Sequence, residues 1–264
     1  MPRLTSLAVA AISLAPVALA DGGDFASADV VFLGEQHDNP AHHARQAELV
    51  AEIAPTALVF EMLTPDQASR ITPELVADEA ALGEALDWAE SGWPDFTMYY
   101  PIFAAAPEAA FFGAAVPRED ARRASEIGMV EAFGQGADRF GLPEPLPADE
   151  QEARQALQAE AHCDALPEEM LPVMVDIQRL RDAKIAEAAL DALEAEGGPV
   201  VVITGNGHAR PDWGAPALIA RAAPDVRMAT LGQAEEGAPP LPEGFDRIET
   251  APAVDRGDPC AAFH

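Results

Sequence analysis

The sequence is short of positive charge, of cysteine and of long apolar runs. Its 264 residues hold 45 acidic side chains but only 16 lysines and arginines, which gives a formal net charge of −29, and Lys184 is the one lysine. A surface this acidic repels nucleic acid and anionic lipid, which argues against both as partners. We interpret the charge as a solubility adaptation to a salty exterior rather than as a functional feature.

Only one stretch of the chain is apolar for long. Leu4–Leu19 follows a single arginine, contains a proline, and ends in a small-x-small cleavage site before Asp21. These features predict that residues 1–20 form a cleaved signal peptide rather than a membrane anchor. No later run reaches the roughly 18 apolar residues that a membrane span requires, and no cysteine follows the cleavage site for lipid attachment. We therefore expect an exported protein without a membrane span, comprising residues 21–264.

Cysteine occurs only at Cys163 and Cys260. In an oxidising compartment these two could form a disulfide that ties the C-terminal tail to the middle of the chain. Two free thiols are the alternative, and a metal site built on them alone would have too few ligands.

Short β-branched or apolar runs alternate with helical patterns along the chain, which predicts an α/β fold with a mostly parallel sheet flanked by helices. The expected strands are Asp29–Gly34, Ala57–Met62, Ala110–Val116, Pro199–Thr204, Val226–Leu231 and, more weakly, Arg247–Ala251. A helix is expected over Pro40–Ile53, because Asn39 can cap it and Pro40 suits its first turn. The pattern over about residues 119–170 predicts a smaller helical insertion. The pattern over Glu168–Glu196 predicts a long helix. The tail after Gly232 is expected to wrap the surface loosely.

Polar side chains follow three of these strands directly. Glu35 and His37 follow the first strand, Glu61 the second, and His208 the fourth; the first and fourth share the pattern Gly-x-x-His. In parallel sheets the functional crevice lies beyond the carboxyl ends of the strands, so these four side chains could meet there. Two carboxylates with two imidazoles indicate either a divalent-metal site or an acid/base pair.

Two further histidines, His42 and His43, lie in the first turns of the next helix. They cannot both face the same way as His37, so we expect one of them at the surface, at the edge of a pocket or in a dimer contact.

Aromatic residues gather between Trp88 and Tyr100, a stretch that includes Trp93, Phe96 and both tyrosines of the chain, Tyr99 and Tyr100. These rings form either an aromatic lid over a flat apolar ligand or ordinary packing against the sheet. A tyrosine in such a lid could bind ferric iron as a phenolate. On the long helix, Arg181 is placed to meet a carboxylate or a propionate.

Several of these stretches resemble the ChaN family of haem-binding proteins, in the superfamily of the TIKI metalloproteases and erythromycin esterases. The similarity extends over about residues 28–231 and lies in Gly34–Asp38 with His42 and His43, Phe60–Met62, Trp93 to Pro101, Gln178 with Arg181 and Asp182, and Gly205–Arg210 with Gly214 and Pro216.

The resemblance implies a parallel α/β domain with a smaller helical domain, and haem bound between them. It implies that a tyrosine, Tyr100 or in reserve Tyr99, is the ligand of the haem iron, and that a histidine of a second subunit assists, with His37, His42, His43 and His208 as candidates. Arg181 or Arg210 would pair with propionates. The expected function is a periplasmic haem-binding protein in haem and iron uptake, a homodimer that could meet an outer-membrane haem receptor.

The alternative is a divalent-metal-dependent hydrolase. In that enzyme His37, Glu61 and His208 would hold the metal ion and Glu35 would act as the general base on a bound water. The wider superfamily places enzymes on the same two Gly-x-x-His motifs, so the resemblance leaves binding and catalysis both open.

Overall fold

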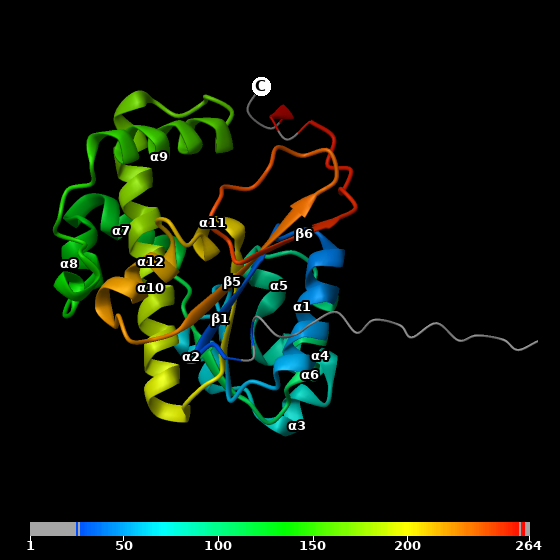
Figure 1. The fold of residues 1–264 in the computed structure, drawn as a ribbon. Helices are drawn as coiled ribbons and strands as arrows, with labels where there is room; N and C mark the ends of the chain where they lie inside the picture. The colour runs from blue at the N-terminus through cyan, green and yellow to red at the C-terminus, as the bar shows by residue number, and fades with distance from the viewer. Residues whose placement is uncertain (1–24, 26, 259, 262–264) are drawn as a thin grey trace, which may run out of the picture.

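The protein is built on one six-stranded, all-parallel sheet, seen near the centre of the computed structural model (Figure 1). The structure describes residues 25, 27–258 and 260–261, so the expected signal peptide lies outside the described residues. The strands are β1 (Val30–Glu35), β2 (Ala57–Phe60), β3 (Ala110–Gly113), β4 (Val200–Gly205), β5 (Met228–Glu235) and β6 (Arg247–Ala251), in the order β3-β2-β4-β1-β5-β6. All six expected strands are confirmed, and β1 and β4 are neighbours, with Val30 paired to Val200.

The central strands are apolar at almost every position because both of their faces are covered. Val30 and Phe32 of β1 point into one core cluster, whereas Val31 and Leu33 point into the other. All four side chains have an exposed fraction of 0%. Burial of each such side chain contributes about 1.5–3 kcal/mol, so these strands fix the layer between the helices.

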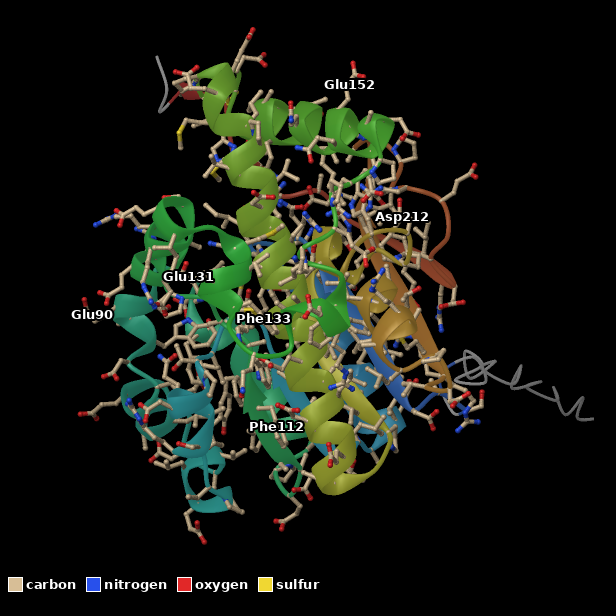
Figure 2. All side chains as sticks on the ribbon, turned by 90° about the vertical axis from the view of Figure 1, so that its left-hand side faces the viewer. Glu90, Phe112, Glu131, Phe133, Glu152 and Asp212 are labelled. Atoms are coloured by element: carbon tan, nitrogen blue, oxygen red, sulfur yellow. A yellow bond between two sulfur atoms is a disulfide. The ribbon has the colours of Figure 1, made fainter. Side chains whose placement is uncertain are left out.

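Helices of the first half of the chain cover one face of the sheet, and helices of the second half cover the other (Figure 1). On the first face lie α1 (Pro40–Ile53), α2 (Pro65–Ser69), α3 (Pro73–Val76), α4 (Glu79–Ala85), α5 (Trp88–Ser91) and α6 (Phe96–Ala105). On the second face, turned toward the viewer in Figure 2, lie α7 (Arg118–Ile127), α8 (Met129–Phe133), α10 (Leu171–Glu196) and α12 (Ala215–Ala222). Helix α1 starts as expected, because the Asn39 side chain accepts a hydrogen bond from the backbone of Ala41 and Pro40 occupies the first turn.

Two helices lie near the carboxyl end of the sheet. Short α11 (Asn206–Ala209) follows β4 directly, and α9 (Ala148–Ala161) packs on α10. The Gly/Pro-rich stretch 134–147 between α8 and α9 holds one short 3-10 helix, Ala137–Phe140. Among the described residues no helix is both long and apolar enough to cross a membrane.

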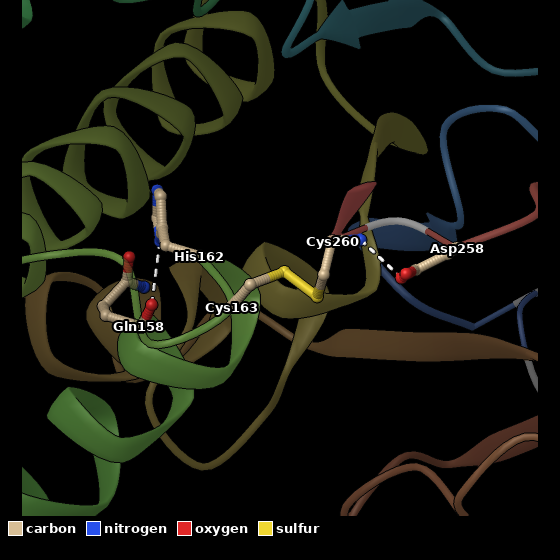
Figure 3. The surroundings of a disulfide bond; sticks show 5 residues. All are labelled: Gln158, His162, Cys163, Asp258 and Cys260. Carbon is tan, nitrogen blue, oxygen red and sulfur yellow. Dashed lines mark hydrogen bonds between the residues drawn. A yellow bond between two sulfur atoms is a disulfide. The ribbon is translucent and has the colours of Figure 1, made fainter. Parts of the chain in front are cut away.

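The C-terminal tail is more firmly held than a loose wrap. Its strand β6 pairs in parallel with β5, and a disulfide joins Cys260 to Cys163 just beyond α9 (Figure 3). Between these two points the Arg256 guanidinium donates to the carboxylates of Asp38 and Glu235, at 2.5–2.7 Å. The expected loose tail is therefore wrong for residues 247–258 and 260, because a strand, ion pairs and a covalent bond fix their positions.

Candidate functional site

Three neighbouring strands deliver polar side chains to one edge of the sheet. Strand β1 ends at Glu35, β2 is followed by Glu61, and β4 leads into α11 with His208. Since these strands are parallel and β4 lies between β1 and β2, their carboxyl ends meet. The structure thus brings together Glu35, His37, Glu61 and His208, as their positions after the strands predict.

Glu35 is a fully buried carboxylate whose contacts hold the first histidine. Its Oε1 lies 2.8 Å from His37 Nδ1 and accepts a hydrogen bond from the Tyr99 hydroxyl at 2.7 Å. Its Oε2 lies 3.4 Å from His43 Nδ1. Burial alone would raise the pKa of Glu35, but the hydrogen bonds and charges of His37 and His43 outweigh it and hold that pKa far below its usual value. Glu35 therefore holds His37 from the buried side, and its role as a general base on water stays a prediction.

Glu61 occupies the centre of the cluster. Its Oε2 accepts hydrogen bonds from the Thr204 hydroxyl at 2.6 Å and from the Gly205 N–H at 2.8 Å. Its Oε1 lies 3.9 Å from His37 Nε2 and 3.7 Å from His208 Nε2. Gly205 is required here, because a Cβ at that position would come within 2.9 Å of His37 Nε2.

The second histidine is held from the long helix. His208 Nδ1 lies 2.6 Å from Asp182 Oδ1, and the other oxygen of Asp182 lies 3.8 Å from an Arg154 nitrogen of α9. The two imidazoles are thus arranged alike. Each has a carboxylate on Nδ1 and turns Nε2 toward Glu61, and a carboxylate in that place fixes the orientation and tautomer of a histidine.

The electrostatics of the cluster favour its ionised forms. Burial would lower the pKa of His37, but the charges of Glu61 and Glu35 raise it to about 9. Burial is likewise outweighed at His208, whose pKa is raised by Glu61 and Asp182, and at Glu61, whose pKa is lowered by the two histidines. The charged forms of the two imidazoles and of Glu61 therefore stabilise one another across this edge of the sheet.

A cavity of about 510 Å³ opens beside Glu61, at the ends of β2 and β3. Its lining is partly apolar and partly charged; it includes Glu61, Met62, Glu90, Trp93, Val116, Arg118, Arg181 and Ile185. Trp93 also contacts the edge of the His37 ring, with ring centroids 4.9 Å apart. Of these residues, Glu90 is labelled in Figure 2. The volume falls within the range of about 300–1,000 Å³ that is typical of ligand sites.

Most of the aromatic stretch packs in the core instead of forming a lid. Residues 96–105 are the helix α6, and Trp88 and Tyr99 are buried in the cluster behind β1 and β2. The Tyr100 hydroxyl donates to the Val76 carbonyl at 3.0 Å, so this phenol is engaged away from the strand ends. Of the aromatic residues in this stretch, Trp93 is the one that lines the cavity.

The remaining expected site residues are spread out. His42 and His43 are both fully buried, so the expectation that one of them faces solvent is wrong. His42 Nδ1 accepts from the Gln36 N–H at 2.9 Å, while His43 Nε2 contacts the His37 carbonyl at 2.7 Å. Arg210 is ion-paired with Asp212, labelled in Figure 2, and covers the Trp213 ring, whereas Arg181 lines the cavity.

The histidines and carboxylates do not converge as metal ligands. Within the described part of the chain, no group of three or more His, Cys, Asp or Glu side chains is arranged to hold a metal ion. Glu61 uses one oxygen for Thr204 and Gly205, and its other oxygen lies 3.9 Å from His37 Nε2 and 3.7 Å from His208 Nε2. The metal expected for the hydrolase alternative thus gains no support from the geometry.

Sequence patterns did not reveal all members of the site. Arg154 comes from the helical insertion, where it also bonds Glu150 and the Trp213 carbonyl, and nothing in its spacing connects it with His208. The hydroxyl of Thr204 is the last side chain before Gly205 in a strand that is otherwise apolar. The sequence signal that could have revealed Thr204 is a polar residue at the end of an otherwise apolar strand.

Comparison with solved structures identifies the fold. ChaN of Campylobacter jejuni, described with cofacially bound haem, is 19% identical with a TM-score of 0.60, over 81% of this chain and 84% of that one. The type III effector HopBA1 is 12% identical with a TM-score of 0.44, over 82% of each chain. A succinoglycan biosynthesis protein is 15% identical with a TM-score of 0.40, over 81% of this chain and 67% of that one. At these identities the first likeness concerns the fold alone, and we base nothing on the other two.

A comparison with curated proteins finds no match to this sequence. A family model described as "Haem-binding uptake, Tiki superfamily, ChaN" matches residues 23–219, which is most of the chain and includes every strand up to β4 together with the whole strand-end cluster. The chain therefore belongs to the ChaN haem-binding uptake family of the Tiki superfamily.

Proposed function

We propose that this protein binds haem in the cavity beside Glu61 and serves haem and iron uptake outside the cytoplasm. The observation that carries the proposal is the position of the cavity: its lining includes Glu61 and Trp93, which both lie against His37, in a chain of the ChaN family. Open parallel sheets bind their ligands at this edge.

The residues of the cavity suit the body of a porphyrin. Trp93, Met62, Val116 and Ile185 supply apolar contacts, and the volume is that of a small-molecule site. Bound haem would supply an iron that accepts a side chain as axial ligand. The tyrosines fit this task poorly, because Tyr99 donates to buried Glu35 and Tyr100 donates to the Val76 carbonyl.

His37 fits better, and we transfer the proposed ligand role from Tyr100 to His37. Its side chain is 34% exposed, against 0% for Glu35 behind it. Glu35 holds Nδ1 and leaves Nε2 as the free nitrogen, the arrangement usual for a ligating histidine. Because the pKa of His37 is raised to about 9, a proton competes with iron at neutral pH. Affinity should therefore rise as the pH increases toward 9.

The location is proposed on two grounds. The N-terminal run carries the pattern of an export signal, and the Cys163–Cys260 disulfide is typical of an oxidising compartment. We propose the periplasm, a homodimer as the haem-bound form, and an outer-membrane haem receptor as a partner.

A haemin titration followed by optical spectroscopy tests haem binding. We expect a shifted Soret band that saturates, with an affinity that increases between pH 7 and 9. His37→Ala should change the spectrum, whereas Tyr100→Phe should leave it unaltered because that phenol is bonded to Val76. A spectrum that never responds to haemin would refute haem binding, and loss of the response in Tyr100→Phe alone would return the ligand role to Tyr100.

A second function is favoured by one observation: the two carboxylate-held imidazoles that flank Glu61. This is an acid/base arrangement, and it suits hydrolysis of an ester or amide in the same cavity. Water would attack the carbonyl carbon while its proton passes to Glu61. The carbon–heteroatom bond would then break, with the leaving group taking a proton from His37.

Hydrolysis can be tested with an ester and amide screen, with and without chelator. If the proposal holds, Glu61→Gln should lower kcat by about 100-fold, while Glu131→Gln, at an exposed position of α8 outside the cavity, should have little effect. Activity should fall as the pH rises through about 9, where His37 loses its proton. No turnover of any ester or amide, or equal turnover in the Glu61 variant, would rule this function out.

A further inference from the structure

We propose that the cavity beside Glu61 contains a carboxylate-binding subsite formed by Arg181 and Arg118, which selects ligands that combine an apolar body with a carboxylate. The inference rests on the proposed use of this cavity for ligand binding, but it does not require that the ligand be haem.

The first observation is that the guanidinium groups of Arg181 and Arg118 make no polar contact with the described residues of the protein. This chain has far more acidic than basic side chains, and most of its described arginines are ion-paired, including Arg45, Arg70, Arg154, Arg210, Arg221 and Arg256. For Arg181 and Arg118 no ion pair or hydrogen bond is found among the described residues, and both line the same cavity. Arg122, Arg123 and Arg139 also have no ion pair among the described residues, but only Arg181 and Arg118 line the cavity beside Glu61, where one bound anion could reach both guanidinium groups.

The second observation is a buried donor without an acceptor. The Nε of Arg181 is buried and makes no hydrogen bond. An unsatisfied buried donor is unfavourable, and more so when it belongs to a charged group. Two of the carboxylates nearby have other partners, since Asp182 holds His208 and Glu61 accepts from Thr204 and Gly205.

The geometry of a guanidinium favours a carboxylate as the missing partner. Its planar donors match the two oxygens of a carboxylate, and charge-assisted pairs of this kind are about twice as strong as neutral hydrogen bonds. Arg118 lies at the start of α7 and is exposed, so it can approach the same group from the rim. Two carboxylates, Glu61 and Glu90, also line the cavity, which confines an anion to the arginine side.

The other residues of the cavity lining indicate the chemistry of the rest of the ligand. Met62, Trp93, Val116 and Ile185 are apolar and include one large ring. They suit an aromatic or acyl body. The long-range field of a chain with formal charge −29 repels anions in general, so discrimination in favour of a carboxylate has to come from local contacts. Haem propionates and small apolar acids both meet this description.

The test compares ligands that differ only in their charge, using the full chain. Indole-3-acetate and indole-3-acetamide share one body, and haemin and haemin dimethyl ester share another. By calorimetry we expect wild type to bind each acid about tenfold more tightly than its uncharged counterpart. Arg181→Gln should reduce that ratio to about 1, and Arg118→Gln should reduce it less. Arg122→Gln, on α7 outside the lining, is the matched control and should keep the full ratio.

The outcomes separate this inference from haem binding. If haemin and its dimethyl ester bind equally while haemin still binds, the subsite is refuted and haem binding stands. If indole-3-acetate is preferred but haemin does not bind, the subsite stands and haem binding is refuted. Any of three results would overturn the subsite. Wild type binds indole-3-acetate and indole-3-acetamide equally, it binds neither haemin nor indole-3-acetate, or Arg181→Gln leaves the ratio of affinities for acid and uncharged counterpart unchanged.

Discussion

Replacing Glu35 with alanine is expected to destabilise the protein by about 3–5 kcal/mol, because the change leaves buried charged groups without their partner. Glu35 has an exposed fraction of 1% and contacts Tyr99, His37 and His43. The free energy of unfolding, measured by urea denaturation at pH 7, gives the size of the loss. Glu131→Ala on α8, an exposed acidic position, is the control and should change it by less than about 0.5 kcal/mol.

The same substitution should change the pH dependence of stability. The folded-state pKa of His37 lies at about 9, above the 6.5 of the free side chain, so its contribution is fully present below pH 6.5 and is lost as the pH rises through 9. Glu35 supplies part of that shift. In Glu35→Ala the His37 pKa, followed by NMR, should therefore fall toward 6.5. A variant with wild-type stability and an unchanged His37 pKa would show that Glu35 does not hold the histidine.

Removing the disulfide is expected to cost about 2–5 kcal/mol. Cys163 and Cys260 are 97 residues apart, so the bond closes a long loop and restricts the unfolded chain strongly. Figure 3 shows the two cysteines beside His162, at the end of α9, and Asp258, whose carboxylate accepts from the Cys260 N–H at 2.9 Å. Without the covalent bond, the tail keeps the Arg256 ion pairs and the hydrogen bond from Asn39 to the Pro252 carbonyl.

Urea denaturation with and without reductant measures this effect. Cys163→Ser/Cys260→Ser should match the reduced wild type, and reductant should not change it further. We expect the loss to lie in global stability, because the bond joins the tail to the helical layer rather than to the strand-end cluster. If reduction changed the midpoint by no more than experimental error, the noncovalent contacts of the tail would be sufficient to hold it.

The strands of this fold could be predicted because burial on both faces leaves a plain trace, a near-continuous apolar run such as Val200–Ile203. Helix α1 was equally clear, since Asn39 and Pro40 mark its start. The sheet order was less accessible, because it depends on which strands pair after long crossovers. It could be predicted only that Glu35, Glu61 and His208 lie close together at the carboxyl ends of their strands, by assuming that the Gly-x-x-His strands are neighbours.

The predictions that failed concern buried polar groups. Histidine in a first helical turn is ordinarily exposed, yet His43 is buried, with its Nε2 2.7 Å from the His37 carbonyl oxygen and its Nδ1, which makes no hydrogen bond, 3.4 Å from Glu35. Tyr99 is likewise buried, with its hydroxyl on Glu35. Such burial depends on partners supplied by distant parts of the chain, and local residue patterns do not record them. The same limit applies to Arg154, which reaches Asp182 from the helical insertion.

The place of β1 in the sheet has a consequence for how the protein is made. This first strand pairs on one side with β4 and on the other with β5, so that Val30 faces Val200 and Met228. Neither edge of β1 can be covered until nearly the whole chain has been synthesised. Contacts this distant in sequence make folding slow, and until they form β1 presents two open edges that can pair with other chains. A chain truncated before β4 should therefore aggregate.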